Sequence, residues 1–403
     1  MPSSFMNADG EQRVRVGWLI DGLGGPAQKD MVLVIRADRI ASIEPWHPAQ
    51  SMALDFSNAT VLPPLMDAHV HLVFSGSVDP NVRSAQLEQS SVQAQAVIIK
   101  HLEQHWRYGV AAVRDGGDRD GAVLRCKQHK FLSAVAPVHV AATCWAWHVK
   151  GRYGKIVGRA LPDNVSPAQA LSLRREGIDH VKLMQSGINS IDRFGEQSRP
   201  QFGREELQAL VAWAHDQMLP VMVHANGEAA VRLAVEAGCD SIEHGYFMGH
   251  DNLKRMADHG TVWVPTVMPM EAFAQAPGLT AAQRDVAHRT LEHQVDQISK
   301  AHQWGVTIAL GTDAGGLGVD HGVSAWQELK LLMAAGLPLE VAIHCATANV
   351  ANLMRLNRSG ELLPGQVADF IVIPGSPGEA LLELPQIQAM YLKGQRQNAS
   401  TNL

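Results

Sequence analysis

The sequence predicts an α/β protein, a (β/α)8 TIM-like barrel with a small β-sandwich domain beside it. Two observations support this fold class. Short β-rich runs alternate with helical patterns from about residue 60 to residue 355, whereas both ends of the chain show short, broken strands without helices. At 403 residues the chain exceeds the usual size of a single domain, and one large barrel with a small appendage accounts for that length.

The barrel is predicted from eight β-rich runs. Amphipathic helices lie between several of them, most clearly over 204–217 and 228–237, where apolar residues recur on one face. Near-continuous apolar strands separated by helices are typical of a parallel barrel. An open, doubly wound sheet is the alternative, but no glycine-rich turn follows the first run to support nucleotide binding. The expected strands are 65–73, 110–114, 137–144, 179–184, 220–224, 241–244, 261–265 and 306–313.

The two ends of the chain predict the second domain. Residues 14–20, 31–35 and 39–43 form short alternating runs broken by Gly, Pro and Asp, and residues 360–373 and 390–394 resemble them. We expect both ends to pair in one small β-sandwich. The predicted division is therefore 1–60 plus 356–403 for the β-sandwich domain and 61–355 for the barrel.

Composition restricts the partners and the compartment. Hydrophobic residues make up 46% of the chain, charged residues 18%, and the net charge is −6, as in an ordinary globular protein. No basic region predicts nucleic-acid binding, and no signal peptide or membrane span is expected. The four cysteines form no CxxC pair, which favours a reducing cytoplasm. We expect a cytoplasmic protein with a small-molecule substrate; a homo-oligomer is left open.

A pair of histidines, His69 and His71, gives the first indication of chemistry. Side chains alternate along a strand, so both imidazoles point to the same side at the end of the first run. Two such imidazoles can form two corners of a metal site. Read alone, the pair is equally compatible with an accidental arrangement on a half-polar strand.

Three later runs also end in polar residues: His224, His244 and Asp313. A single histidine at a strand end is more often structural than a metal ligand. Barrel enzymes, however, hold their active sites at the carboxyl ends of the strands. Four histidines and one aspartate expected at the same rim therefore predict a metal site.

Lys182 lies within an apolar run, where an unpaired ammonium is disfavoured and the neutral amine is promoted. A neutral amine can react with CO2 to give a carbamate, whose two oxygens suit the bridging of two divalent metals. The alternative is a lysine that reaches solvent or pairs with Glu243 or Asp313. We favour the carbamate, because metals beside Lys182 would repel an ammonium.

These motifs together resemble the amidohydrolase superfamily over nearly the whole chain. Within it, the sequence is most similar to the imidazolonepropionase-related branch, which includes prolidase-like and other Xaa-amino-acid dipeptidases. The residues 364–369 near the C-terminus are similar to the β-sandwich domain of the same family. The motifs that carry the resemblance are Asp67-Ala-His69-Val-His71, Val181-Lys182-Leu-Met, His224-Ala, Ile242-Glu-His244-Gly and Gly311-Thr-Asp313-Ala.

The resemblance implies a binuclear metal centre. His69, His71 and Asp313 would bind one ion, His224 and His244 the second, and carboxylated Lys182 with a water or hydroxide would bridge them. Zinc suits histidine and carboxylate ligands best, and manganese, cobalt and iron stay open. Asp313 would serve as general base and then general acid. The implied reaction is hydrolysis of an amide bond in a dipeptide, an N-acyl amino acid or a cyclic amide.

Two alternatives belong to other classes. A mononuclear deaminase or an imidazolonepropionase-like hydrolase of cyclic amides would need only one metal. The deaminases place a glutamate three residues after the fifth-strand histidine; that position is Gly227 here, and Glu228 falls one residue late. A non-catalytic relative is the second alternative, and it is disfavoured because every ligand position is filled.

Substrate contacts are expected mainly in the loop 144–155, which is rich in aromatic and cationic residues. His148 is the candidate to bind the substrate carbonyl or tetrahedral oxygen, and Arg152 to bind a carboxylate. A solvated loop anchored by its tryptophans is the alternative. The predicted substrate-binding residues are His148, Arg152, Tyr153, Asn226 and His321.

Two further expectations concern structure around the site. Arg114 and Asp115, at the end of the second run, are expected to form a local ion pair rather than to contact substrate. Residues 266–281 are expected to be either a flexible lid or a long surface loop.

Overall fold

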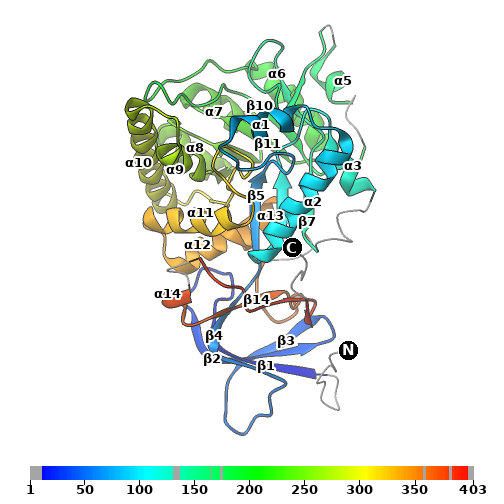
Figure 1. Ribbon diagram of the computed structural model, residues 1–403, viewed down its shortest axis with the longest axis vertical. Helices are drawn as coiled ribbons and strands as arrows, with labels where there is room; N and C mark the ends of the chain where they lie inside the picture. The colour runs from blue at the N-terminus through cyan, green and yellow to red at the C-terminus, as the bar shows by residue number, and fades with distance from the viewer. Residues whose placement is uncertain are drawn as a thin grey trace.

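The computed structural model describes residues 11–129, 137–163, 165–172, 176–356, 360–380 and 384–397. Figure 1 shows a larger part, in which helices surround parallel strands, above a smaller part made of strands from both ends of the chain. The α/β class expected from the sequence is confirmed. The strand β4 (Leu54–Leu62) leads from the smaller part into β5 (Leu65–Val70) of the larger one.

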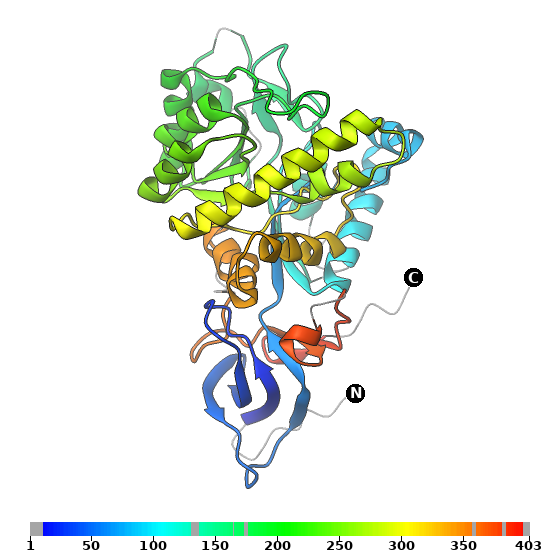
Figure 2. The same cartoon turned by 90° about the vertical axis from the view of Figure 1, so that its left-hand side faces the viewer.

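The smaller part is one seven-stranded sheet in the order β16-β15-β14-β4-β1-β2-β3. Its two halves join where β14 pairs antiparallel with β4, so the two ends of the chain meet as expected. The sheet is continuous rather than two separate stacked sheets, and Figure 2 shows its strands curling around. Its remaining strands are β1 (Glu11–Leu19), β2 (Gln28–Arg36), β3 (Arg39–Pro45), β14 (Phe370–Pro374), β15 (Ala389–Leu392) and β16 (Gln395–Arg396).

The curl brings the outer strand β3 back to the segment that precedes β14. Ile40 N donates to Gln366 O at 2.9 Å, and Gly365 N donates to Ile40 O at 2.7 Å. The enclosed space is filled by apolar side chains from both ends of the chain, such as Leu33 and Phe370, and Phe370 stacks on Tyr391 with ring centroids 4.5 Å apart. This core gives the smaller part its own hydrophobic interior.

The larger part contains two parallel sheets. One has the order β5-β6-β7 and the other β13-β12-β11-β10-β8-β9. Seven of the eight expected strands are present within these sheets. Their bounds are β6 (Val110–Asp115), β7 (His139–Ala142), β10 (Val181–Met184), β11 (Val221–Ala225), β12 (Ser241–His244) and β13 (Val262–Val264).

The eighth expected strand, 306–313, contains only isolated bridge residues and no strand. It nevertheless links the two sheets: Ala309 N donates to Trp263 O at 2.9 Å on one side, and Ala68 N donates to Leu310 O at 2.9 Å on the other. On the opposite side, Asp179 N donates to Ala142 O at 2.9 Å. The strand geometry fails at Asp313, whose φ of 59° lies in the left-handed region.

The loop after the third expected strand also differs from the prediction. It contains two short parallel strands, β8 (Ala146–His148) and β9 (Gly158–Ala160), and β8 pairs with β10. The backbone of His148 is therefore part of the second sheet, and only the residues between β8 and β9 form a loop.

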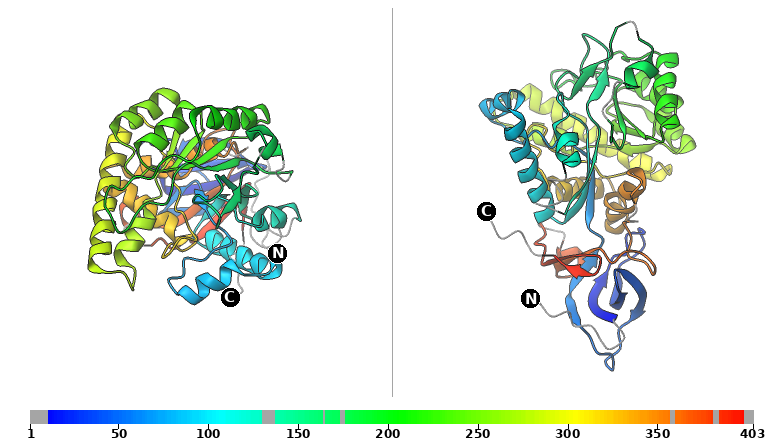
Figure 3. Two further views of the ribbon diagram at one scale, coloured as in Figure 1. Left: turned by 90° about the horizontal axis from the view of Figure 1, so that it is seen from above. Right: turned by 90° about the vertical axis from the view of Figure 1, so that its right-hand side faces the viewer.

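Helices lie outside the parallel strands, as the view from above in Figure 3 shows. Helix α6 (Arg204–Asp216) and helix α7 (Glu228–Glu236) match the two helices expected most clearly, each ending one residue early. Their apolar faces are buried, as amphipathic periodicity requires. The other helices are α1 (Pro80–Leu87), α2 (Ser91–Arg107), α3 (Ala122–Gln128), α5 (Pro167–Ser172), α8 (His250–His259), α9 (Met268–Gln275), α10 (Ala281–Gln303), α11 (Val323–Ala334), α12 (Leu339–Ala346), α13 (Ala348–Leu353) and α14 (Pro377–Ala380).

The segment 266–281, expected as a lid or a surface loop, contains the short helix α9, which packs beside the long helix α10. The buried carboxyl group of Glu328 accepts hydrogen bonds from Val267 N at 2.8 Å and Met268 N at 2.9 Å, so it satisfies backbone donors at the start of α9. Among the described residues, no helix has the length and apolarity needed to cross a membrane.

Candidate metal centre

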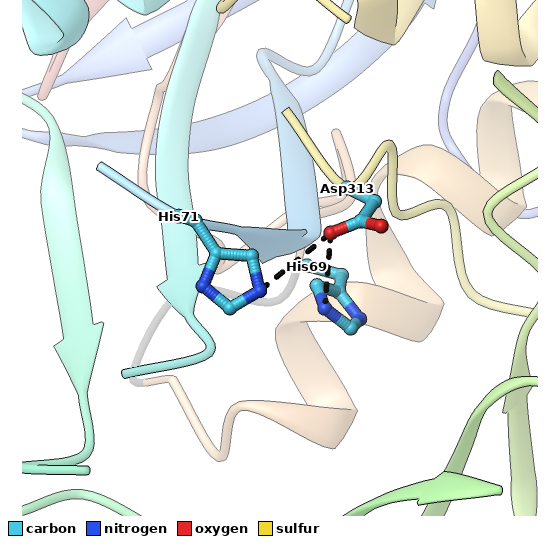
Figure 4. A group of neighbouring side chains, drawn as sticks. All are labelled: His69, His71 and Asp313. Carbon is cyan, nitrogen blue, oxygen red and sulfur yellow. Dashed lines mark ion pairs between the residues drawn. The ribbon is translucent and has the colours of Figure 1, made fainter. Parts of the chain in front are cut away.

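The ends of β5 and of the segment before Asp313 bring three ligand atoms together. His69 Nε2 lies 3.5 Å and His71 Nε2 3.6 Å from Asp313 Oδ1, and the three atoms lie within 4.8 Å of one another. Figure 4 shows both imidazoles turned toward the carboxylate of Asp313. The predicted convergence of these three residues is therefore present in the structure.

Two buried aspartates fix the backbone that carries these side chains. Asp67 Oδ1 accepts hydrogen bonds from His69 N at 3.1 Å and Thr312 N at 3.0 Å, which ties β5 to the residue before Asp313. Asp115 Oδ2 accepts from Leu72 N at 2.8 Å, immediately after His71. These bonds hold the three ligands in position from behind.

His69 is oriented by a chain of buried polar groups. Its Nδ1 lies 2.7 Å from Glu243 Oε2, and Glu243 Oε1 accepts from Arg114 Nη2 at 2.9 Å and from Ser241 Oγ at 2.6 Å. Because a carboxylate only accepts hydrogen bonds, Nδ1 carries the proton and Nε2 presents its lone pair to the cavity. Such a carboxylate–histidine arrangement is typical behind metal-binding histidines.

His71 is held in the same tautomer. Its Nδ1 lies 3.1 Å from Gly117 O, a carbonyl that can only accept, so Nε2 again carries the lone pair. The ring also needs a glycine beside it, because a Cβ at Gly116 would come within 2.7 Å of His71 Cε1. Two nitrogen lone pairs and one carboxylate oxygen thus face one another with no donor among them, an arrangement that suits a cation.

The other two predicted histidines, His224 and His244, lie beside this group. The ring centroid of His244 is 4.9 Å from that of His69 and 4.7 Å from that of His224. His244 Nδ1 lies 2.7 Å from Thr266 Oγ1, whereas His224 Nε2 lies 3.0 Å from Gly187 O and donates to it. Among the described residues, only His69, His71 and Asp313 form a group with converging ligand atoms.

Lys182 completes the set of predicted ligands. It lines the same cavity, it is 1% exposed, and its Nζ has no hydrogen-bond partner among the described residues. Both oxygens of Glu243, the partner weighed for it from the sequence, are occupied by His69, Arg114 and Ser241. Burial lowers the pKa of Lys182 to about 8.

Burial also controls the charge of the other groups. It lowers the pKa of His71 and of His224 to about 4, with a further contribution from the charge of Lys182, and it lowers the pKa of His69 and His244 well below the usual value. The four imidazoles are therefore neutral near pH 7, as metal ligation requires. Desolvation raises the pKa of Asp313 to about 7 against the opposing charge of Lys182.

A cavity of about 630 Å³ opens in front of these residues. His69, His71, Lys182, His224, His244 and Asp313 all line it, and so do two predicted substrate-binding residues, Tyr153 and Asn226. The Tyr153 ring centroid lies 5.4 Å from that of His224. Figure 1 places the carboxyl end of β5 inside the larger part of the molecule, among its helices.

The structure does not place the other three predicted substrate-binding residues on this cavity. The His148 ring is turned to Val149 O, at 2.9 Å from Nδ1, because its backbone belongs to β8. Arg152 is exposed and donates to Arg199 O at 2.7 Å. His321 is buried between Phe74 O, at 2.8 Å, and His105, at 3.1 Å.

The ion pair expected for Arg114 has a different partner. Neighbouring side chains on a strand point to opposite faces, so Arg114 pairs with Glu243 in the interior, whereas Asp115 binds backbone amides. Sequence reasoning therefore missed the orienting role of Glu243. Its position directly before His244 is the signal that could have indicated it.

Sequence reasoning also missed Arg83, which lines the cavity from α1. No strand-end motif contains it, because it follows β5 at the start of a short helix. Asp79 caps that helix, with Oδ1 accepting from Asn81 N at 2.8 Å, and the cap is the local reason the helix begins there.

Comparisons with known proteins identify the class. The profile of the amidohydrolase family matches residues 60–397, so the chain belongs to that family. A sequence relative is ochratoxinase of Aspergillus niger, 32% identical over 225 residues that cover 54% of this chain and 45% of the fungal protein. This chain thus spans about half the length of that relative.

Two further similarities place the chain within the family. Imidazolonepropionase of Paracoccus denitrificans is 27% identical over 84% of this chain and 86% of that protein. A crystal structure of a Xaa-Pro dipeptidase with methionine bound in its active site superposes with a TM-score of 0.81 and 27% identity, covering 96% of this chain and 99% of that chain. The prolidase-like and imidazolonepropionase-related resemblance is thereby confirmed.

Proposed function

We propose that this protein is a metal-dependent hydrolase that cleaves an amide bond in a dipeptide, an N-acyl amino acid or a cyclic amide. The observation that carries the proposal is the set of three acceptor atoms, His69 Nε2, His71 Nε2 and Asp313 Oδ1, within 4.8 Å at the wall of a cavity of about 630 Å³. A cavity of this volume suits a small molecule rather than a folded protein.

The donor set fits divalent metal ions, and we propose that two ions are bound. Zinc is the simplest choice of metal. His69, His71 and Asp313 would hold one, and His224 and His244 the other. When bound, such ions lower the pKa of a coordinated water toward neutrality and polarise a carbonyl group. The neutral imidazoles and the occupied Nδ1 positions of His69 and His71 support this assignment.

We propose that Lys182 carries a CO2-derived carbamate, whose two oxygens would help to hold the two ions. The lone pair of the neutral amine forms a bond to the carbon of CO2, one C–O π bond becomes a lone pair on oxygen, and the nitrogen loses a proton to solvent water. The buried Nζ without a partner and its lowered pKa support this step. The product is an anion, which relieves the burial of an unpaired cation.

Asp313 is the proposed general base and acid. Its carboxylate accepts a proton from the attacking water as the oxygen bonds to the scissile carbonyl carbon, and it returns that proton to the amide nitrogen as the C–N bond breaks. Tyr153 and Asn226 line the same cavity and are proposed to contact the substrate, whereas His148 stays a prediction without a place on the cavity wall.

We also propose that the two parallel sheets and the segment 306–314 act as one closed barrel and that residues 61–355 form the catalytic domain. The hydrogen bonds of Ala309, Ala68 and Asp179 across the sheet edges support closure. A cytoplasmic location is proposed from the four cysteines, all buried and without a disulfide. The homo-oligomer stays an untested prediction.

An imidazolonepropionase-like reaction with a single metal is the second candidate. Two observations favour it: among the described residues only three candidate ligands converge within 4.8 Å, and imidazolonepropionase is among the relatives. The deaminase alternative gains no such support, since Glu228 is exposed and is not among the residues that line the cavity. Metal analysis separates the two candidates, with about two ions per chain expected for the amide hydrolase and one for the alternative.

A substrate screen tests the proposal. The metal-loaded protein is assayed against dipeptides, N-acyl amino acids and cyclic amides, with lactones and phosphoesters as controls. We expect turnover of an amide that disappears on chelation and returns when zinc is added. Turnover that survives complete metal removal, or activity restricted to the control esters, would contradict the proposal.

A further inference from the structure

Arg83 is one of two cationic side chains that line the cavity among the described residues, the other being Lys182. It comes from α1, a helix with no fully buried residue, yet its own side chain is half-buried. An arginine that leaves the solvated face of such a helix to reach a cavity wall needs a structural or a functional reason.

One end of the guanidinium is fixed by the backbone. Arg83 Nη1 donates to Ser75 O at 3.1 Å, to Ser77 O at 3.4 Å and to Gly315 O at 3.4 Å. All of these bonds use the same nitrogen. Nε and Nη2, which form the other edge of the planar group, make no hydrogen bond within the described part of the chain.

The position of this free edge relates it to the proposed chemistry. Gly315 lies two residues after Asp313. Burial lowers the pKa of Arg83, and the charge of Asp313 opposes that shift, so the two side chains interact electrostatically. No ion pair joins Arg83 to any carboxylate in the described ranges. The guanidinium therefore faces the cavity beside the proposed general base without a protein anion bound to it.

Other acidic residues on the cavity wall are engaged elsewhere. Asp192 Oδ1 accepts from Gln283 Nε2 at 2.9 Å, and Glu196 pairs with Arg193, whose Nε lies 3.1 Å from Oε2. Both acids are exposed. Arg83 is thus a cationic group on a wall that also contains these two exposed acids, and much of the remaining wall is apolar, with Phe74, Ile156, Ile188, Met270, Phe273 and Leu317.

We propose that Arg83 binds a free carboxylate of the substrate through Nε and Nη2, next to the scissile amide. This inference rests on the proposed hydrolase function and narrows its substrates to amides of apolar α-amino acids whose carboxylate is free. The two parallel N–H donors match the two oxygens of a carboxylate, a geometry that an ammonium lacks. Arg83 takes the role that the sequence predicted for Arg152.

A paired-substrate experiment tests the proposal. N-acetyl-L-leucine and other N-acyl and dipeptide substrates with an apolar C-terminal residue are compared with the same compounds as C-terminal carboxamides. For Arg83→Met we expect kcat/KM to fall about 10- to 100-fold for the carboxylates, mainly through KM. For the carboxamides we expect a change below about threefold. Arg83→Lys should recover part of the loss, because lysine keeps the positive charge but lacks the two parallel N–H donors.

Arg232→Met is the matched control, since Arg232 is a half-exposed helical arginine that pairs with Glu236 and does not line the cavity. It should leave both substrate series unchanged. Equal losses for carboxylates and carboxamides in Arg83→Met would show that Arg83 only holds the backbone of residues 75–77 and 315, and would overturn the proposal. A wild-type preference for carboxamides would also overturn it.

A binding measurement separates this inference from the proposed function. The melting temperature of the metal-loaded protein is recorded with L-leucine and with L-leucinamide. We expect stabilisation by the acid only, lost in Arg83→Met. If no amide is hydrolysed but this selectivity holds, the hydrolase function fails and Arg83 stays a carboxylate site. If amides are hydrolysed and the selectivity is absent, only the Arg83 inference fails.

Discussion

The two halves of the candidate metal centre differ in how completely the protein alone arranges them. In the half formed by His69, His71 and Asp313, both histidine tautomers are fixed from behind and three acceptor atoms converge. In the half formed by His224 and His244, the rings are close, but His224 Nε2 donates to the carbonyl of Gly187.

This difference follows from where the ligands come from. His69 lies in β5 and His71 directly follows its last residue, while Asp67 bonds that strand to the backbone beside Asp313, so a few buried bonds determine all three positions. His224 and His244 end two separate strands and depend on two different loops. We infer that the first half is preorganised and that the second half completes its geometry only with a bound ion or substrate.

The largest effect is expected from Asp313→Asn in the first half. The amide keeps the shape of the side chain but cannot accept a proton, so kcat should fall at least about 1,000-fold while the fold is retained. Kinetics and circular dichroism check this. A rate within tenfold of wild type would assign the proton transfer to another residue.

Lys182 lines the same cavity as both halves, and Lys182→Ala should remove most activity and the second equivalent of metal. Short carboxylic acids such as acetate and propionate should restore part of both, because they supply the oxygens of the missing carbamate. Activity assays and metal analysis with and without the acids provide the test. Full activity of the variant in the absence of acid would refute the bridging role.

Glu243→Gln removes the carboxylate that orients His69 in the first half, without replacing a proposed ligand. Loss of the carboxylate behind His69 should weaken metal binding about 10- to 100-fold. Ser241→Ala is the control, because Ser241 donates to the same carboxylate but does not contact His69. Competition with a zinc chelator gives the affinities. Equal affinities for Glu243→Gln and wild type would mean that the tautomer of His69 is fixed by something else.

Acid should destabilise the metal-free protein through two buried histidines, His101 and His105. Burial lowers the pKa of His101 to about 4 and that of His105 to about 3, whereas unfolded histidines titrate near 6.5. Between those pKa values the unfolded chain binds more protons than the folded chain. The free energy of unfolding should therefore be highest above about pH 6.5 and should fall as the pH falls below that value.

The variant His105→Gln should reduce the slope of this pH dependence by about 1.4 kcal/mol per pH unit between pH 4 and 6. Denaturant titrations of the metal-free protein measure the slope. Replacing the exposed His302 with glutamine is the control and should change nothing. An unchanged slope in His105→Gln would show that His105 does not contribute to acid lability.

The sequence predicted the positions of the candidate ligands on the cavity wall much better than those of the candidate substrate contacts, for a physical reason. His69, Lys182, His224 and His244 lie on strands and His71 directly follows the last residue of β5, so strand periodicity indicates which way these side chains point. Glu243 and Arg83 act through tertiary hydrogen bonds to residues far away in the chain, which no local pattern encodes.

Loop geometry also explains the errors. His148 was expected at the cavity, but the pairing of β8 with β10 fixes its backbone in the sheet and its ring turns to Val149 O. The last expected strand is reduced to the bridge residue Ile308, and Asp313 at its end adopts a positive φ. Strained backbone conformations of this kind cluster at functional sites, so a candidate functional residue is where a regular strand pattern is expected to fail.

The smallest effect is expected from Arg152→Met. Arg152 is exposed, bonded to Arg199 O and absent from the cavity wall, so KM for carboxylate-bearing substrates should change less than about twofold. Steady-state kinetics beside Arg83→Met check this directly. A tenfold rise in KM would restore the prediction made from the sequence.

Anomalous diffraction from crystals of the zinc-loaded protein is the most direct test of the metal centre. We expect a strong zinc peak bonded to His69 Nε2, His71 Nε2 and Asp313, a second, weaker peak beside His224 and His244, and additional density on Lys182 Nζ. Crystals of active protein with no zinc between His69, His71 and Asp313 would contradict the metal-dependent function proposed for this protein.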